Sequence, residues 1–168
     1  MNTKYSYNLI DAINPTLSNT IGDILKLPIN ISHKHFEKVE NYTKECVSIS
    51  KKAWNKNENS YWFCINQLID LKTKGGIDTL EEAYDHYKQY WKNKFYQLHQ
   101  NEEELNRQFI EIYGLQEELT PDVQLSEITI LQEELDSKKL KKLENEFRNQ
   151  SSEVRKPDLP FKEKEVMA

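Results

Sequence analysis

With 168 residues, the chain is long enough for one domain with a hydrophobic core and too short for two large ones. Charged residues make up 30% of it and hydrophobic residues 37%, so the apolar side chains must be gathered on stripes, as in amphipathic helices. Four glycines and five prolines are too few for the regular turns of a many-stranded sandwich or barrel, which excludes a mostly-β fold.

The net charge of -5 is divided unevenly along the chain. Residues 34–56 carry six lysines against three glutamates, whereas residues 101–136 carry eleven carboxylates against Arg107 alone. The acidic stretch should repel a phosphate backbone, so the first third of the chain is the better candidate for contact with nucleic acid.

The remaining composition points to an intracellular protein without a disulfide framework. Cys46 and Cys64 lack the paired spacing of a zinc site, and we expect both to be small buried thiols. No secretory signal and no apolar run of about 18 residues is present. These features predict a cytoplasmic protein with no membrane contact.

Residues 1–32 mix short apolar runs with helix breakers. A cluster of Ile21, Ile24, Leu25 and Leu27 ends at Pro28, and Ile29 and Ile31 alternate with polar neighbours as in a strand. The pattern predicts an irregular region with a short helix and an edge strand.

Apolar residues at three- and four-residue steps after Ser32 predict a helix from residue 33 to about 50. Residues 55–60 read as a polar loop and 61–71 as a short, well-buried segment, either helical or extended. Gly75 and Gly76 then break the chain.

Thr79 and Glu82 form the pattern of a capping box, which predicts that a helix begins here. One apolar face continues without losing phase to Tyr113, so we expect a single helix over 80–113; a second capping pattern at Asn101 and Glu104 leaves a break there as an alternative. Its aromatic stripe is either core or a stacking platform for bases, and its helical period favours core. Tyr96, on the opposite face, is the exception.

The acidic residues of "NEEELNRQFIEIYGLQEELTPDV", 101–123, fit the solvated face of this helix better than a carboxylate site. Gly114 stands where a left-handed residue closes a helix, and Pro121 prevents its resumption. "EITI", 127–130, suggests a short strand. A charged helix of about 15 residues follows, and its apolar positions are Leu131, Leu135, Leu140, Leu143 and Phe147.

The residues from Ser151 onward lack an apolar pattern, which predicts disorder. The expected fold is therefore mainly α: a helical bundle with one long helix, a short irregular or strand segment near the N-terminus and a disordered C-terminal tail. The expected divisions are 1–32, the irregular region, 33–150, a helical domain, and 151–168, the tail.

The sequence offers no active site. It has no glycine-rich cofactor turn, nucleophile elbow, phosphate loop or HExxH motif, and "KGGID" at 74–78 is only two glycines in a loop. His33 and His35 would point away from each other on a helix, while His86 and His99 stand alone on a charged surface. We therefore predict no catalytic, cofactor-binding or metal-binding residue.

The basic residues leave two interpretations open: a solvated helix and loop, or a patch that binds nucleic-acid phosphates. The candidate nucleic-acid-binding residues are Lys34, Lys38, Lys51, Lys52 and Lys56.

Four stretches carry a family resemblance in their order and spacing. They are "AINPTLSNTIGDILKLPI" at 12–29, "VSISKKAWNKNENSYWF" at 47–63, the long block at 80–123, and "EITI" at 127–130. Together they resemble the C-terminal portion of adenine-specific DNA methyltransferases of the BREX phage-exclusion system (PglX-like), relatives of single-chain restriction-modification methylases. The resemblance implies that 1–32 is the end of a target-recognition-like region. After residue 130 the sequence departs from the family pattern.

The resemblance implies a methylase segment without the catalytic machinery. The family's Asn-Pro-Pro-Tyr/Phe motif and cofactor glycines are absent here, and "NPTL" at 14–17 is no substitute. Methyl transfer needs a site for S-adenosylmethionine and for the flipped adenine, so the cofactor would belong to a separate catalytic domain and this chain alone should be inert.

The function that follows is a noncatalytic C-terminal segment that supports target recognition, with double-stranded DNA or the methyltransferase catalytic domain as partner. The alternative is a helical scaffold that binds another protein of a defence complex without touching DNA.

Overall fold

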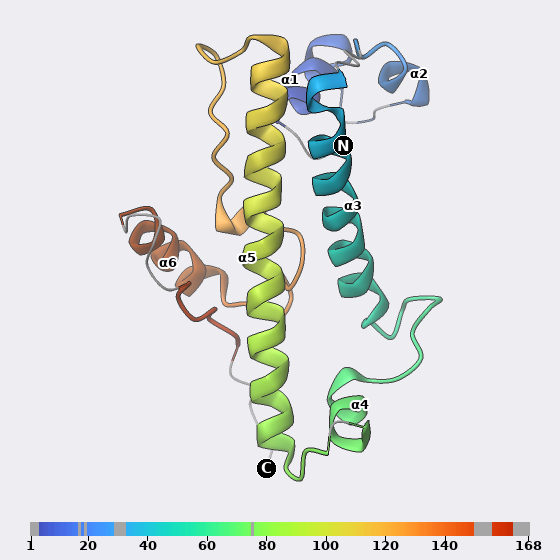
Figure 1. Cartoon of the computed structure of the whole chain (residues 1–168), viewed down its shortest axis with the longest axis vertical. Coiled ribbons are helices and arrows are strands. Elements are labelled where there is room, and N and C mark those ends of the chain that lie inside the picture. The colour runs from blue at the N-terminus through green and yellow to red at the C-terminus, as the bar shows by residue number, and fades with distance from the viewer. Residues whose placement is uncertain are drawn as a thin grey trace. The chain divides into compact units, whose positions relative to one another are not determined.

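The computed structural model describes residues 4–16, 18, 20–28, 33–74, 76–149 and 156–162. Over these residues the chain is mainly helical (Figure 1). The helices are α1 (Lys4–Ile13), α2 (Ile21–Ile24), α3 (His33–Asn55), α4 (Gln67–Lys74), α5 (Leu80–Tyr113) and α6 (Ser137–Asn149), with a 3-10 turn, η1 (Leu125–Glu127). Within these ranges no strand forms, and β pairing is limited to an isolated bridge between Leu135 and Phe161. The mainly helical prediction is confirmed.

The long helix α5 is continuous, as its unbroken ribbon shows (Figure 1). At its start the Thr79 hydroxyl accepts a hydrogen bond from the Glu82 amide at 3.2 Å, which is the N-terminal half of the predicted capping box. At its end Gly114 has φ 67°, and the amide of Leu115 donates to the carbonyl of Ile110 at 3.0 Å. This is the glycine-closed helix end that the sequence predicted, and the alternative break at Asn101 is wrong.

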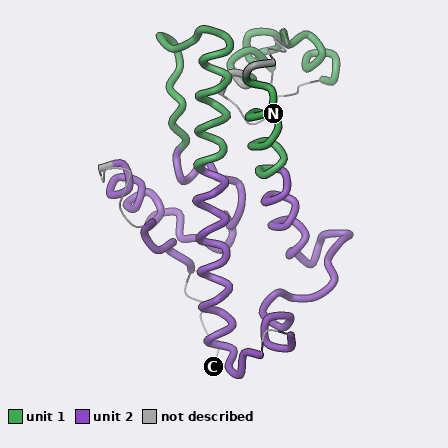
Figure 2. The backbone as a smooth tube through the Cα atoms, in the orientation of Figure 1, with its two compact units in different colours: residues 1–46, 100–123 green, residues 47–99, 124–168 purple. Residues whose placement is uncertain are grey.

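The chain folds into two compact units, each built from two separate stretches of sequence (Figure 2). Unit 1 comprises residues 1–46 and 100–123, and unit 2 comprises residues 47–99 and 124–168. Both α3 and α5 therefore contribute residues to both units. Neither predicted boundary, at 32 or at 150, coincides with these divisions.

Unit 1 is held together by polar side chains as much as by its core. Its buried apolar residues are Ile10, Leu105, Ile110 and Val123. Between α3 and α5, Asn101 donates to Glu45 at 2.8 Å, and the Nδ1 of His35 lies 2.7 Å from the Oε1 of Gln108. α1 packs against α2, and the sequence did not predict α1. The expected edge strand at Ile29 and Ile31 lies outside the described residues.

Unit 2 has the larger hydrophobic core, centred on α5. Ala83, Tyr87, Trp91, Phe95 and Leu98 are buried on the predicted stripe, so most of the aromatic stripe is core, as its periodicity favoured. Partners come from α3 and from the chain after residue 124: Ile49, Leu125, Ile128, Ile130, Leu131, Leu135, Leu140 and Leu159.

A second face of α5 is also covered in unit 2. Tyr96 is 1% exposed and stacks on Phe147 of α6, with ring centroids 5.6 Å apart. Tyr96 therefore belongs to the core as well, because α6 packs on the face opposite the stripe. α6 begins at Ser137, where Asp136 accepts from the amides of Lys138 and Lys139 at 2.9 and 3.1 Å.

Three predictions for unit 2 need correction. Residues 61–71 are not well buried: Tyr61 is 90% and Trp62 64% exposed, and the helix in this stretch begins only at Gln67. "EITI", 127–130, is no strand: residue 127 ends the 3-10 turn η1, residues 128 and 129 have no regular structure, and residue 130 begins a turn. Leu131 and Leu135, which were expected on the charged helix, precede α6, and Leu131 lies in the turn with φ 64°.

Part of the predicted tail is ordered. In unit 2 the amide of Asp136 donates to Pro160 and that of Lys162 to Glu134, both at 2.8 Å, and Leu159 is 7% exposed. Residues 156–162 thus form a strap, and the disorder predicted from Ser151 onward does not extend to them. The rest of the predicted tail lies outside the described residues.

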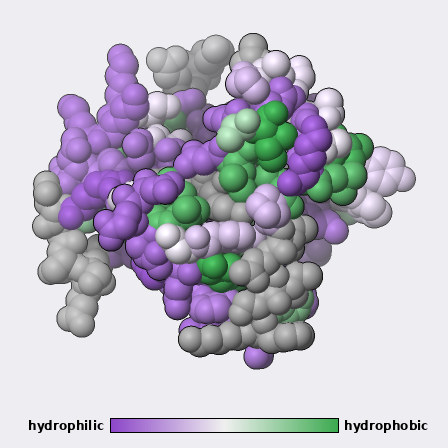
Figure 3. Space-filling view, turned by 90° about the horizontal axis from the view of Figure 1, so that it is seen from above, coloured by the Kyte–Doolittle hydropathy of each residue, from purple (hydrophilic) through white to green (hydrophobic). Residues whose placement is uncertain are grey.

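Apolar residues also reach the surface. Seen from above, they form separate groups bordered by hydrophilic residues (Figure 3). Ile21 and Leu25, in and just after α2, are 77% and 80% exposed. These exposed groups fit a chain whose hydrophobic content is spread over amphipathic helices.

Candidate functional site

The predicted basic residues all belong to α3 or to the residue after it. The side chains of Lys38, Lys51 and Lys52 are exposed, and that of Lys34 lies outside the described residues. Lys51 and Lys52 stand in the last turns of α3, within unit 2. Cations near a helix C-terminus are stabilised by its dipole, and these two can reach a ligand without breaking a described ion pair.

Lys56 differs from the others because it is turned into unit 2. It forms an ion pair with Glu134, donates to the Tyr87 hydroxyl at 2.7 Å, and lies 4.4 Å from the centroid of the Trp91 ring. Burial lowers the pKa of its ammonium group, and Glu134 counteracts that effect. Its charge is neutralised within the chain. Lys56 is therefore a weaker candidate for phosphate binding than the exposed Lys51 and Lys52.

A cleft of about 740 Å³ opens beside this ion pair, entirely within unit 2. Its walls come from the end of α3, the start of α4, α5, the turn at 129–134 and the strap. The Lys56–Glu134 pair links the α3 wall to the 129–134 wall and so fixes two sides of the cleft.

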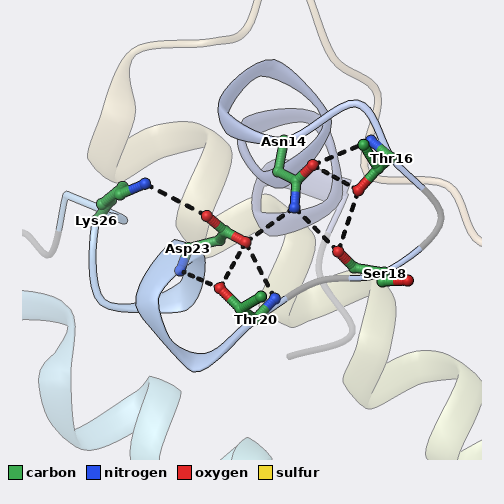
Figure 4. Close-up of polar contacts among 6 residues, drawn as sticks. All are labelled: Asn14, Thr16, Ser18, Thr20, Asp23 and Lys26. Atoms are coloured by element: carbon green, nitrogen blue, oxygen red, sulfur yellow. Dashed lines mark hydrogen bonds and ion pairs between the residues drawn. The ribbon is translucent and has the colours of Figure 1, made fainter.

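The Asn-Pro-Thr and Gly-Asp-Ile segments of the family resemblance meet in unit 1 (Figure 4). The Asp23 carboxylate accepts from the Asn14 side chain at 2.9 Å, and from the amide and hydroxyl of Thr20 at 3.0 and 2.8 Å. Asn14 in turn accepts from the Thr16 hydroxyl at 2.6 Å, and Lys26 pairs with Asp23 at 3.3 Å.

This network fixes the ionisation state of Asp23. The hydrogen bond from the Thr20 backbone, followed by those from the Asn14 and Thr20 side chains, holds the pKa of Asp23 well below its ordinary value. Every group around the carboxylate donates to it, so the arrangement is a saturated helix cap, and it leaves Asp23 no role as an acid or base.

The acidic stretch is a solvated face only in part: Glu111, Glu117, Glu118 and Asp122 are exposed, whereas the three acids at 102–104 are covered to different degrees. Glu102 is only 8% exposed, Glu103 accepts from the Val123 amide at 3.2 Å, and Glu104 accepts from Gln108 at 2.8 Å and pairs with Arg107. Consecutive residues on a helix point about 100° apart, so three adjacent acids cannot all face water once the helix has neighbours on two sides. Glu103 and Glu104 therefore stabilise unit 1 through hydrogen bonds and an ion pair.

The histidines and cysteines also differ from expectation. His99 is 3% exposed and packs edge-to-face against Phe147 at 5.6 Å, so it does not lie on a charged surface. Cys64 is exposed, which corrects its predicted burial, whereas Cys46 is half-buried. Burial raises the pKa of Cys46 to about 12, with further contributions from Glu102 and Glu45.

The described part of the chain lacks two kinds of feature. No three His, Cys, Asp or Glu side chains come together in a way that could hold a metal ion. No helix there combines the length and apolar character needed to cross a bilayer.

The sequence did not reveal the cleft. Its walls come from segments as far apart as residues 50 and 162, and no local pattern reports such a juxtaposition. The one available signal was Lys56 at the end of the basic stretch, followed by aromatic residues at 61–63, and it gave no indication of a cavity.

Comparison with known proteins gives two relatives. The chain is 34% identical over 131 residues to the adenine-specific methyltransferase PglX of Lacticaseibacillus casei (strain Zhang), a match that covers 77% of this chain and 11% of that protein. It is 33% identical over 125 residues to the adenine-specific methyltransferase BrxX of Escherichia coli O9:H4 (strain HS), covering 74% of this chain and 10% of that protein.

No family model and no solved structure matches the chain. The two relatives agree with the resemblance seen in the four sequence stretches. The chain spans about a tenth of their length. By sequence it therefore belongs with the adenine-specific methyltransferases PglX and BrxX, as a homologue of one segment of them.

Proposed function

We propose that the chain is a noncatalytic C-terminal segment of an adenine-specific DNA methyltransferase of a phage-defence or restriction-modification system. The observation that carries the proposal is the homology over three quarters of this chain to two such methyltransferases. In this role it supports target recognition in the cytoplasm, while S-adenosylmethionine binds a catalytic domain elsewhere. The chain's own sequence has no Asn-Pro-Pro-Tyr/Phe motif.

The segment contacts the DNA backbone through the exposed lysines of α3. Lys51 and Lys52 support this role best, because both are exposed at the end of one helix. Lys38 is a further exposed cation on α3, whereas Lys56 is a weaker candidate because it pairs with Glu134. Phosphate contacts of this kind are independent of sequence and sensitive to salt.

The test is duplex DNA binding by the full chain across a salt series. We expect the Lys51→Ala/Lys52→Ala variant to bind more weakly and to lower the slope of log affinity against log salt by roughly two, about 0.9 for each lost contact. Lys44→Ala is the matched control, because Lys44 is exposed but paired with Glu40 at 2.7 Å. Absence of binding at low salt, or an unchanged slope in the double variant, would overturn DNA contact.

A second function is supported by the exposed aromatic residues after α3. Tyr61 and Trp62, 90% and 64% exposed, suit a protein partner, since aromatic residues are enriched at interfaces. In this alternative the chain is a helical scaffold in a defence complex. Light scattering and co-purification would then give a stoichiometric complex without a salt-dependent DNA shift.

Calorimetry with S-adenosylmethionine addresses the noncatalytic role. We expect no heat of binding from this chain alone, because the proposed cofactor site lies in another domain. Clear saturable binding would contradict the proposal.

A further inference from the structure

The cleft of unit 2 has one wall made by a single face of α3. Ser50, Ala53 and Trp54 line it at helical steps of three and four residues, and Asn57, two residues beyond the end of α3, follows them in the lining. Trp54 is 60% exposed although it belongs to this wall, so its indole presents free surface at the cleft. An exposed indole beside a cavity is a surface on which a flat ring can stack.

The polar side chains of the lining favour a ligand that accepts hydrogen bonds. The side-chain oxygens of Asn57, Asn66 and Gln67, all lining residues, accept from the amides of Asn59 and Leu68 and from the Trp91 indole, at 3.1, 3.0 and 2.8 Å. Within the described chain, their amino groups have no acceptor. Three amino groups, with two N–H donors each, are therefore left for a ligand or for solvent.

The charges of the lining cancel. Glu134 is neutralised by Lys56, and the remaining charged lining residues are Glu133 and Lys162. A site without net charge suits an uncharged ring with carbonyl or ring-nitrogen acceptors, and it does not suit a polyphosphate. If the ring carries a phosphate, the positively charged side chain that binds this phosphate must lie outside the cleft.

Lys51 supplies that cation. It is exposed and precedes Trp54 by three residues, so the two side chains are neighbours on the surface of α3. A strand whose base stacks on Trp54 can thus place a backbone phosphate at Lys51 without bringing negative charge into the cleft.

We propose that this cleft binds an unpaired nucleobase of a DNA strand, stacked on Trp54 and held at its edge by the amides of Asn57, Asn66 and Gln67. The inference rests on the proposed function in taking DNA as the partner. The proposed function includes a salt-dependent contact with the duplex backbone. The inference adds a second contact, in which the cleft binds an unpaired base of a DNA strand.

The experiment measures anisotropy of a labelled single-stranded 12-mer with the full chain. Trp54→Ala should weaken binding about tenfold, the scale of losing one stacked base. Trp62→Ala is the matched control: Trp62 is equally exposed at 64% but does not line the cleft, so its loss should change affinity less than about twofold. Circular dichroism verifies that both variants fold.

Asn66→Asp tests the hydrogen bonds while preserving the fold. An aspartate oxygen can still accept from the Leu68 amide, but the donor is replaced by a charged acceptor. We expect weaker binding of the 12-mer and unchanged binding of duplex DNA. Unchanged 12-mer binding in both Asn66→Asp and Trp54→Ala would overturn the inference.

Two further outcomes would also overturn it. Equal losses in Trp54→Ala and Trp62→Ala would mean general adhesion of exposed aromatic residues. Adenosine monophosphate that competes as strongly as the 12-mer would mean that the occupant is a free nucleotide. In either case, duplex binding that still depends on Lys51 and Lys52 would leave the proposed function standing, whereas loss of all duplex binding at low salt would overturn the proposed function itself.

Discussion

Lys56 shows how one side chain can decide the geometry of a cleft. Its ammonium group lies among Glu134, Tyr87 and Trp91, and burial also raises the pKa of the Tyr87 hydroxyl, an effect that Glu134 reinforces. Because the hydroxyl stays protonated, it donates to Glu134 at 2.7 Å. The carboxylate therefore receives donors from α5 and from the end of α3 at once.

We expect Lys56→Met to lower the free energy of unfolding by about 1–2 kcal/mol, less than for a fully buried pair because Glu134 is partly exposed. Glu134→Gln should destabilise as well, and the double variant should lose less than the sum of the two because the residues act together. Urea denaturation measures all three. Additive losses would mean that the residues contribute independently.

Asp23 gives a prediction about pH. Its folded pKa lies below the ordinary value of 3.8, so its hydrogen bonds contribute stability that is complete above pH 3.8 and is lost as pH falls toward the folded pKa. Asp23→Asn should therefore lower the melting temperature near neutral pH, and the difference from the native chain should shrink below about pH 4. Thermal unfolding across this range measures it; a difference independent of pH would show that the charge of Asp23 does not matter.

Residue-scale roles were the hardest to predict. The exposure of Lys51 and Lys52 followed from the pattern of α3, but the enclosure of Lys56 did not, because its partners are 31 and 78 positions away. Glu102 was likewise assigned to water, since an acid on a helix usually is. Which acids are covered depends on what packs beside the helix, and the local sequence does not contain that information.

At the scale of the elements, α5 was predicted from Leu80 to Tyr113 and is found there. Its N-terminus has the capping hydroxyl of Thr79, its C-terminus is followed by Gly114, and one apolar face continues along the whole helix. α1 carries neither signal, and its ten residues are too few for a clear period; its contact with α2 is a tertiary effect. "EITI", 127–130, was read as a strand because it is rich in β-branched residues, but residue 127 ends η1 and residue 130 begins the turn that contains Leu131, with φ 64°.

Gly114 provides a test of how α5 ends. A side chain at φ 67° is strained, so Gly114→Ala should lower the free energy of unfolding by about 1 kcal/mol. Gly22→Ala is the matched control: Gly22 lies inside α2, and an added Cβ would meet the Thr20 hydroxyl at an ordinary contact distance of 3.5 Å. The control should be neutral or slightly stabilising. Equal losses in both variants would contradict a role for the left-handed conformation.

At the scale of the whole molecule, each unit is assembled from sequence-distant stretches. The expected boundary at residue 32 rests on a capping serine and on the family resemblance, and the one at 150 on the end of the apolar pattern. The observed divisions fall inside α3 and α5, where nothing in the local sequence changes character. The strap was missed for a related reason: its two apolar anchors, Leu159 and Phe161, are too few to produce a periodic signal.

The strap can be tested through its buried anchor. Leu159 is 7% exposed, so Leu159→Ala should lower the free energy of unfolding by about 2–3 kcal/mol through lost burial and the cavity left behind. Asp158→Ala is the adjacent control, because its side chain is 93% exposed and its ion pair with Lys92 should contribute little. Chemical denaturation that shows no loss in Leu159→Ala would mean that the strap does not hold unit 2 together.

The unequal environments of the two cysteines make the natural chain suitable for single-site labelling. A maleimide reacts with thiolate; Cys64 offers its sulfur at the surface, whereas Cys46 is half-buried with its pKa raised to about 12. One dye should therefore attach at Cys64 near neutral pH without removal of the other cysteine. Because Cys64 lies two residues from Asn66, a wall residue of the cleft, the dye's emission would follow the arrival of an occupant in real time.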